Sequence, residues 1–186
     1  MFDIDQFVSD CREAATDPDP RGAIREVLER AVHRPEAMQR ALPATRAEIA
    51  PLYMSEELSV LRVVWAPGMS FRPHNHQMWA AIGLYGGQER NTFYRRTPGG
   101  IEVAGERALR TGEVAVLGSE AIHAVRNPEP SFTGAIHIYG GDIIHRAGRH
   151  EWEEPALVEV DYDFEHVRRV FEQASAGPGV GEASAG

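Results

Sequence analysis

The sequence contains no lysine, because all 19 of its basic residues are arginine. Enzymes that need a Schiff-base lysine or a P-loop lysine are therefore excluded. Cysteine is almost as scarce, since Cys11 is the only one. One cysteine excludes an internal disulfide framework and a Cys-x-x-Cys metal or redox site. The unusual feature that remains is a set of eight histidines in 186 residues, so histidine is the first place to look for chemistry.

Long apolar runs and a basic leader segment are also missing. The apolar run at residues 79–85 is among the longest, and it is far too short for a membrane span. The N-terminus is acidic, unlike a signal peptide, so we expect a cytoplasmic protein without a membrane partner. Acidic residues outnumber basic ones by 28 to 19, so the net charge is −9 and no nucleic-acid partner is expected.

The first 50 residues have a helical pattern. Apolar residues recur with the period of an α-helix between Ile24 and Val32, and Pro20 and Pro35 are typical of helix starts. The chain length fits one domain, which we place at residues 1–174. The Gly-, Ala- and Ser-rich stretch 175–186 is expected to be a disordered tail.

From Leu58 onward the pattern changes to short β-rich runs separated by glycine and proline. Eight such runs at even spacing, with no helix between them, predict an all-β antiparallel sandwich or barrel. The runs are residues 58–65, 69–76, 79–85, 90–96, 101–104, 113–117, 121–126 and 132–139. A further strand is expected near residues 156–160, and a short helix at 164–174.

His74 and His76 lie two residues apart in a predicted strand, so both side chains point to one face and can meet one metal ion. A third ligand must come from another strand. His123 is a candidate, although taken alone it is better interpreted as a hydrogen-bonded core histidine. Pairing the runs 121–126 and 132–139 around residue 130 places His123 opposite His137, with Tyr139 on the same face.

Two motifs resemble those of the cupin superfamily. Gly68-x5-His74-x-His76 resembles the first cupin motif, and the run from Gly112 to Asn127, which includes His123, resembles the second. With their flanking strands they cover residues 58–140. The resemblance implies a double-stranded β-helix barrel that follows the helical N-terminal segment, with a metal ion bound by these three histidines.

One departure from the cupin pattern narrows the resemblance. Most metal cupins have a glutamate four or five residues after the second histidine, where this chain has Ala80 and Ala81. Three neutral ligands leave three positions of an octahedral ion open, which suits a bidentate substrate and O₂ at Fe(II). The pattern resembles the cysteine-dioxygenase-like thiol dioxygenases. Those carry a Ser-x-His-x-Tyr strand, of which Ala135-x-His137-x-Tyr139 matches two positions.

This resemblance implies an Fe(II)-dependent dioxygenase that oxidises a small thiol to its sulfinate with O₂. His137 and Tyr139 would be the catalytic pair, in which His137 orients Tyr139. Zinc or nickel could replace iron in the purified form. The resemblance is also compatible with a homodimer. No cysteine–tyrosine crosslink is expected, because Cys11 lies in a predicted helix.

The sequence defines the substrate less closely than it defines the metal ligands. The arginine that clamps the substrate carboxylate in cysteine-specific members is missing from residues 53–56, so we expect a thiol other than cysteine. The candidate substrate-binding residues are Arg72, Arg62, Arg95 and Trp79. Among the remaining histidines, His145 and His150 are expected to line the mouth of the cavity.

Two other functions stay open on the sequence. A three-histidine cupin can cleave a diketone or an aromatic acid. Thiol binding leaves no signature residue, so the sequence separates these two reactions only through His137 and Tyr139. A non-catalytic cupin that binds a small molecule is the other alternative. A tetrahedral zinc site of hydrolytic type is chemically possible as well.

Overall fold

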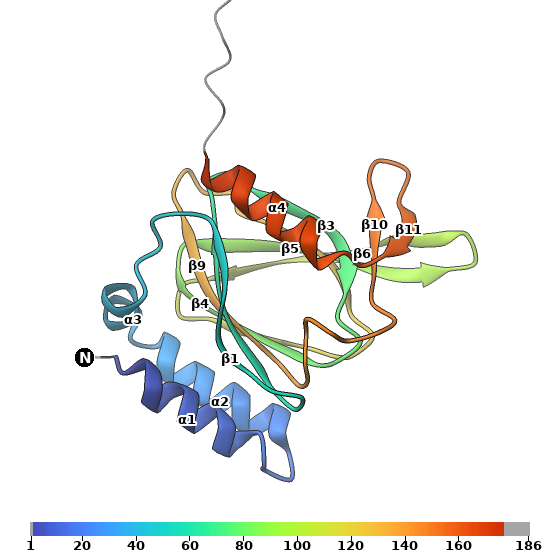
Figure 1. Ribbon diagram of the computed structural model, residues 1–186. Coiled ribbons are helices and arrows are strands. Elements are labelled where there is room, and N and C mark those ends of the chain that lie inside the picture. Colours follow the sequence, from blue (N-terminus) through green and yellow to red (C-terminus); the bar gives the residue numbers. More distant parts are fainter. Residues whose placement is uncertain (1, 177–186) are drawn as a thin grey trace, which may run out of the picture.

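Two antiparallel β-sheets form the body of the protein, which the computed structural model describes for residues 2–176 (Figure 1). The five-stranded sheet has the order β1-β2-β9-β4-β7, and the six-stranded sheet has the order β11-β10-β3-β8-β5-β6. The first sheet consists of β1 (Glu48–Met54), β2 (Ser59–Trp65), β4 (Ala80–Gly86), β7 (Val114–Leu117) and β9 (Thr133–Tyr139). The second consists of β3 (Ser70–Asn75), β5 (Gln88–Thr97), β6 (Gly100–Arg110), β8 (Ile122–Arg126), β10 (His150–Glu153) and β11 (Val158–Asp161).

The chain winds back and forth between these sheets. Strands β2, β4, β7 and β9 belong to the five-stranded sheet, whereas β3, β5 and β8 belong to the other. Each strand from β3 to β5, and again from β7 to β9, therefore lies in the sheet opposite to the strand before it. This winding of antiparallel strands is the double-stranded β-helix, so the predicted fold class is confirmed.

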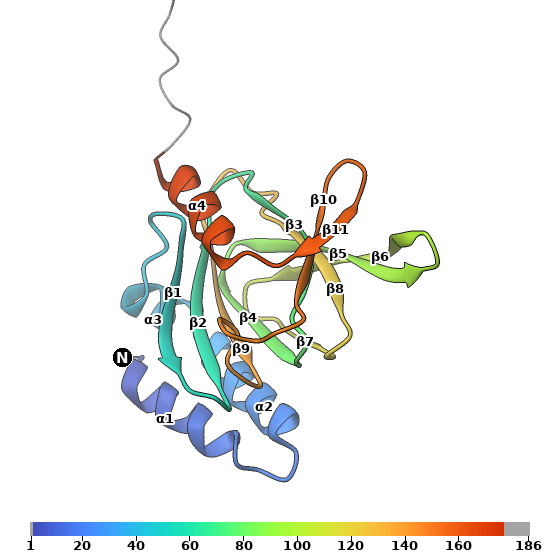
Figure 2. The same cartoon turned by 45° about the vertical axis from the view of Figure 1, so that its right-hand side comes forward.

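Helices lie on two sides of the barrel, and their bounds are α1 Ile4–Ala14, α2 Pro20–Val32, α3 Pro35–Ala41 and α4 Phe164–Ser175. The first two begin at aspartates, Asp3 and Asp19, whose carboxylates accept hydrogen bonds from backbone N–H groups of the first turn. Helices α1 and α2 lie on the same side of the barrel, and α4 lies on the other side (Figures 1 and 2). None of the helices within residues 2–176 is long and apolar enough to cross a membrane.

Two apolar cores follow from this arrangement. Leu28 of α2 packs with Ile136 and Ile138 of β9 on the outer face of the five-stranded sheet. The second core fills the space between the sheets, where α4 contributes Val167 and Phe171. Inward-facing residues therefore come from both sheets and from a helix near the C-terminal end of the described residues.

The predicted N-terminal helical segment is too long. Residues 48–54 form strand β1, which pairs with β2 at the edge of the five-stranded sheet. Pro51 lies in the middle of β1 and conceals the strand pattern in the sequence. It is tolerated there because an edge strand leaves one row of N–H groups without a partner strand. Strand β10 was not predicted from the sequence. Only Ser175 and Ala176 of the predicted disordered tail lie within the described residues.

The predicted hairpin of residues 121–126 and 132–139 is wrong. Strand β8 pairs with β3 and β5 in one sheet, whereas β9 pairs with β2 and β4 in the other. Asn127 holds the crossing between them, because its buried amide donates to the backbone carbonyls of Trp65, Ala66 and Ser131. His123 is therefore opposite His74, and not opposite His137.

Candidate metal centre

Three buried histidines converge in the barrel interior. His74 lies on β3, His76 follows that strand directly, and His123 lies on β8 at the position paired with His74. The Nε2 atoms of His74 and His76 are 3.2 Å apart, and those of His76 and His123 are 3.4 Å apart. One ligand atom from each residue lies within 4.8 Å of the others. The antiparallel pairing of β3 with β8 thus brings the two sequence motifs together.

The spacing of these nitrogens fits a metal ion. Imidazole nitrogens lie about 2.0–2.1 Å from a bound zinc, so two neighbouring nitrogens on one such ion are roughly 2.8–3.4 Å apart, from octahedral to tetrahedral geometry. Burial and the neighbouring histidines lower the pKa of His74 and His76 well below the ordinary value, and burial lowers that of His123 to about 4. The three side chains are therefore neutral at neutral pH, which is the form that binds a metal.

Two of the histidines are oriented through their other ring nitrogen. Nδ1 of His123 lies 2.8 Å from Oδ1 of Asn91, and Nδ1 of His74 lies 3.1 Å from the backbone oxygen of Arg72. Because these oxygens accept, each Nδ1 carries the proton and the lone pair of each Nε2 points to the common centre. Asn91 was not predicted, although its position two residues after buried Glu89 on β5 places it on the same face.

His137 and Tyr139 extend the site along β9. The ring of Tyr139 is 5.0 Å from that of His76 between centroids, and its hydroxyl is 3.1 Å from Nδ1 of His137. Burial raises the pKa of Tyr139, so its hydroxyl stays protonated. The structure thus brings all five predicted metal-binding and catalytic residues into one interior region, even though the strand pairing used to connect His123 with His137 is wrong.

A small cavity of about 40 Å³ adjoins the histidines and is closed on one side by α4. Apolar and aromatic side chains from both sheets form most of its wall. The lining residues include Leu61, Val63, Phe71, Val125, Ile143, Val167 and Phe171. Such a lining excludes bulk water from the metal position.

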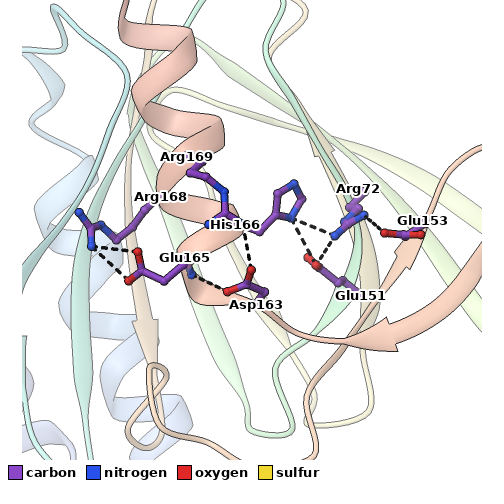
Figure 3. Close-up of polar contacts among 8 residues, drawn as sticks. All are labelled: Arg72, Glu151, Glu153, Asp163, Glu165, His166, Arg168 and Arg169. Atoms are coloured by element: carbon purple, nitrogen blue, oxygen red, sulfur yellow. Dashed lines mark hydrogen bonds and ion pairs between the residues drawn. The ribbon is translucent and has the colours of Figure 1, made fainter.

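Arg72 does not reach the cavity. A bulge between Phe71 and His74 shifts the strand register by one residue, so that Phe71 and His74 face inward while Arg72 faces outward. Its guanidinium is held instead by the carboxylates of Glu151 and Glu153, and it lies 2.9 Å from Nδ1 of His166 on α4 (Figure 3). Arg72 therefore joins β3, β10 and α4.

The other predicted substrate contacts also lie elsewhere. Arg62 is on the outer face of β2, where it pairs with Glu48 and donates to the backbone oxygen of Pro43. Arg95 is solvent-exposed and pairs with Glu102 across the β5–β6 pair. Trp79 packs beside Gly140 in the core that α1 and α2 share with the five-stranded sheet. None of these three side chains lines the cavity.

His145 and His150 are likewise absent from the cavity wall. His145 is exposed and pairs with Asp142. His150 begins β10 on the outer side, where it faces Glu159 and Asp161 of β11. Their predicted place at the cavity mouth is wrong because both side chains pair with surface carboxylates.

Arg149, by contrast, lines the cavity and was not predicted. It is only 5% exposed, and its guanidinium lies 3.5 Å from the ring centroid of Tyr162. Nε donates to the backbone oxygen of Asn75, and Nη1 to that of Ile143. An arginine in a Gly-rich turn has no distinguishing pattern in the sequence, so only the folding of this turn against the barrel reveals it.

The strand order and winding define a double-stranded β-helix, the cupin barrel fold, and the three histidines inside it form a site that could hold a metal ion. No protein-family model matches the chain.

Solved structures provide distant likenesses. An RmlC-like cupin family protein from Methanocaldococcus jannaschii is 10% identical, with 55% of this chain and 87% of that chain covered and a TM-score of 0.46. A Klebsiella pneumoniae protein with a double-stranded β-helix domain is 14% identical, with 59% and 86% covered and a TM-score of 0.44. The protein BH2720 of Bacillus halodurans is 13% identical, with 72% and 84% covered and a TM-score of 0.48. The assignment of the fold therefore rests on the strand order and winding of this chain.

Proposed function

We propose that the protein is an iron(II)-dependent dioxygenase that oxidises a small thiol to its sulfinate. The observation that carries this proposal is a centre of three neutral histidines, which no carboxylate within residues 2–176 joins as a ligand, beside the hydrogen-bonded pair His137–Tyr139. When bound, iron(II) supplies the redox chemistry by which one thiol and one O₂ give one sulfinate. The apolar wall keeps water out, and Tyr139 lines the cavity in which a ligand would bind.

Arg149 points to the class of thiol. It is the positively charged side chain on the cavity wall, and a buried guanidinium favours an anionic partner. Its Nε and Nη1 are engaged by backbone oxygens, which fix the guanidinium in place. We therefore expect a small thiol that carries a carboxylate as the substrate.

Oxygen uptake with a panel of substrates tests the proposal. The purified protein is loaded with iron(II) without oxygen and then mixed with aerated thiol acids, with cysteamine as a thiol lacking a carboxylate, and with a β-diketone. We expect O₂ uptake and sulfinate in a one-to-one ratio, with the thiol acids preferred. Uptake with the diketone alone would indicate carbon–carbon cleavage instead. Absence of both bound metal and uptake would indicate a binding protein.

Variants connect the activity to the site. His123→Ala is expected to lose the metal, as measured by elemental analysis, whereas the matched change of the exposed His145 to alanine keeps it. Arg149→Met is expected to raise KM for the thiol acids more than tenfold and to leave KM for cysteamine nearly unchanged. Full iron content in His123→Ala would contradict the ligand assignment. An equal change of KM for both kinds of thiol would contradict the role of Arg149.

A further inference from the structure

Glu89 is a buried carboxylate in the barrel interior that the proposed reaction does not yet use. It lies on β5 and is fully buried. Its Oε1 atom receives two donors, because Nε1 of Trp65 is 2.7 Å away and Nε2 of His137 is 3.3 Å away. No hydrogen-bond partner among the described residues reaches Oε2. A carboxylate in such a place is costly unless its partners need it, so its contacts merit explanation.

The donors of Glu89 keep it ionised. Burial by itself raises the pKa of this carboxyl group, but the hydrogen bonds that His137 and Trp65 donate lower the pKa below its ordinary value. An ionised carboxylate only accepts hydrogen bonds. The indole of Trp65 only donates them, and this fixes which oxygen of Glu89 faces the pair of donors.

The contact determines which nitrogen of His137 carries the proton. Because Oε1 of Glu89 accepts, Nε2 of His137 must donate. A neutral imidazole has one donor and one acceptor, so Nδ1 of His137 accepts from the Tyr139 hydroxyl, which is 3.1 Å away. Tyr139, His137 and Glu89 thus form one directed chain of hydrogen bonds, which begins at the Tyr139 hydroxyl and ends at Glu89, with the Tyr139 ring next to that of His76.

We propose that Glu89 is a positioning residue, which holds His137 in the Nε2–H tautomer and thereby sets the direction of the Tyr139 hydroxyl beside the metal. Its effect on turnover rests on the proposed dioxygenase function, whereas its effect on the tautomer does not. The thiol dioxygenases that the sequence resembles have a serine where this chain has Ala135. The alanine side chain cannot form a hydrogen bond with His137. Glu89 reaches the same imidazole from the opposite sheet.

Nitrogen NMR of histidine reads the tautomer directly. The protein is labelled with ¹⁵N-histidine, stripped of metal and loaded with diamagnetic zinc, and the His137 signals are assigned by their loss in His137→Gln. We expect the Nε2–H form in the unmodified protein. Glu89→Met removes the acceptor at similar volume and is expected to abolish the preference for that form. Glu89→Gln is expected to keep it, because Trp65 holds the amide oxygen in the place of Oε1.

Leu109→Met is the matched control, since Leu109 is the cross-strand partner of Glu89 and lies in the same core. This variant is expected to leave the His137 signals unchanged. If Glu89→Met keeps the Nε2–H tautomer, or if the unmodified protein has the Nδ1–H or the doubly protonated form, the proposal is wrong.

Kinetics form the second arm of the test. With iron-loaded protein and a thiol acid, Glu89→Met is expected to lower kcat at least tenfold, with KM and iron content little changed. Glu89→Gln is expected to recover kcat to within about threefold of the unmodified protein. A loss of kcat in Glu89→Met that Glu89→Gln does not recover would contradict the positioning role. If the tautomer result holds and no thiol is oxidised by the unmodified protein, the proposed function fails while the role of Glu89 in positioning stands.

Discussion

Individual histidines couple the site to the stability of the fold. His123 is almost fully buried, and burial lowers its pKa from 6.5 to about 4. Below pH 6.5 the unfolded chain gains a proton at this residue that the folded chain does not accept until about pH 4. The contribution of neutral His123 to folding stability is therefore fully present above pH 6.5 and is lost as the pH falls to about 4. His74 and His76 shift in the same direction.

We accordingly predict that the metal-free protein loses unfolding free energy between pH 7 and pH 4, with about 3 kcal/mol from His123 alone. Urea unfolding of the chelator-treated protein at a series of pH values measures this dependence. In His123→Gln the slope is expected to decrease, because one of the titrating groups is gone. The same slope in both proteins would show that His123 does not titrate in this way.

At the scale of elements, Arg72 connects β3 and β10 with the helix that covers the cavity. Glu151 is 1% exposed, and its carboxylate contacts both Arg72 and His166 of α4 (Figure 3). Removing one partner of a buried ion pair leaves a charge without compensation, which costs about 3–5 kcal/mol. An exposed pair contributes about 0–1 kcal/mol. This protein has a pair of each kind on a strand. Arg72 pairs with the buried Glu151, and Arg95 pairs with the exposed Glu102.

We predict that Arg72→Met lowers the unfolding free energy by about 3 kcal/mol. Arg95→Met, the matched control for the exposed pair with Glu102, is expected to change it by less than about 1 kcal/mol. Chemical denaturation measures both, and amide exchange in α4 is expected to accelerate only in Arg72→Met. Equal small effects of the two changes would mean that the link between Arg72 and α4 does not stabilise the fold.

The same elements show what the sequence can and cannot predict. Short alternating runs predict the strands, and the spacing of His74 and His76 predicts their common face, because side-chain direction within a strand is local. His123 is added to them only by the resemblance of its motif to the second cupin motif. The pairing of strands is not local, and so the hairpin proposed for His123 and His137 is wrong. The bulge after Phe71 turns Arg72 outward, although its residue spacing from His74 predicts the inner face. Arg149 enters the cavity through a turn, where no periodicity exists to reveal it.

For the whole molecule, the close fit of the N-terminal helices on the barrel makes them part of the same folding unit. Leu28 of α2 packs so closely on β4 that a Cβ atom placed on Gly83 would lie 2.7 Å from its Cγ atom. Only glycine allows this approach, and the backbone at Gly83 is not in the left-handed region. The helices and the five-stranded sheet therefore share one continuous core, which includes Ile136 and Ile138 beneath Leu28.

We predict that Gly83→Ala lowers the unfolding free energy by about 1–3 kcal/mol through overpacking against Leu28. Gly105→Ala is the matched control in a strand, because nothing lies within 4 Å of its added Cβ atom, and it is expected to be nearly neutral. In a double-mutant cycle, Gly83→Ala is expected to cost less on a Leu28→Ala background, where the clashing atoms are gone. Circular dichroism and tryptophan fluorescence are expected to report one coincident transition, since the helices and the barrel unfold together. Separate transitions, or equal costs for the two glycine changes, would mean that the helices are not an integral layer of the fold.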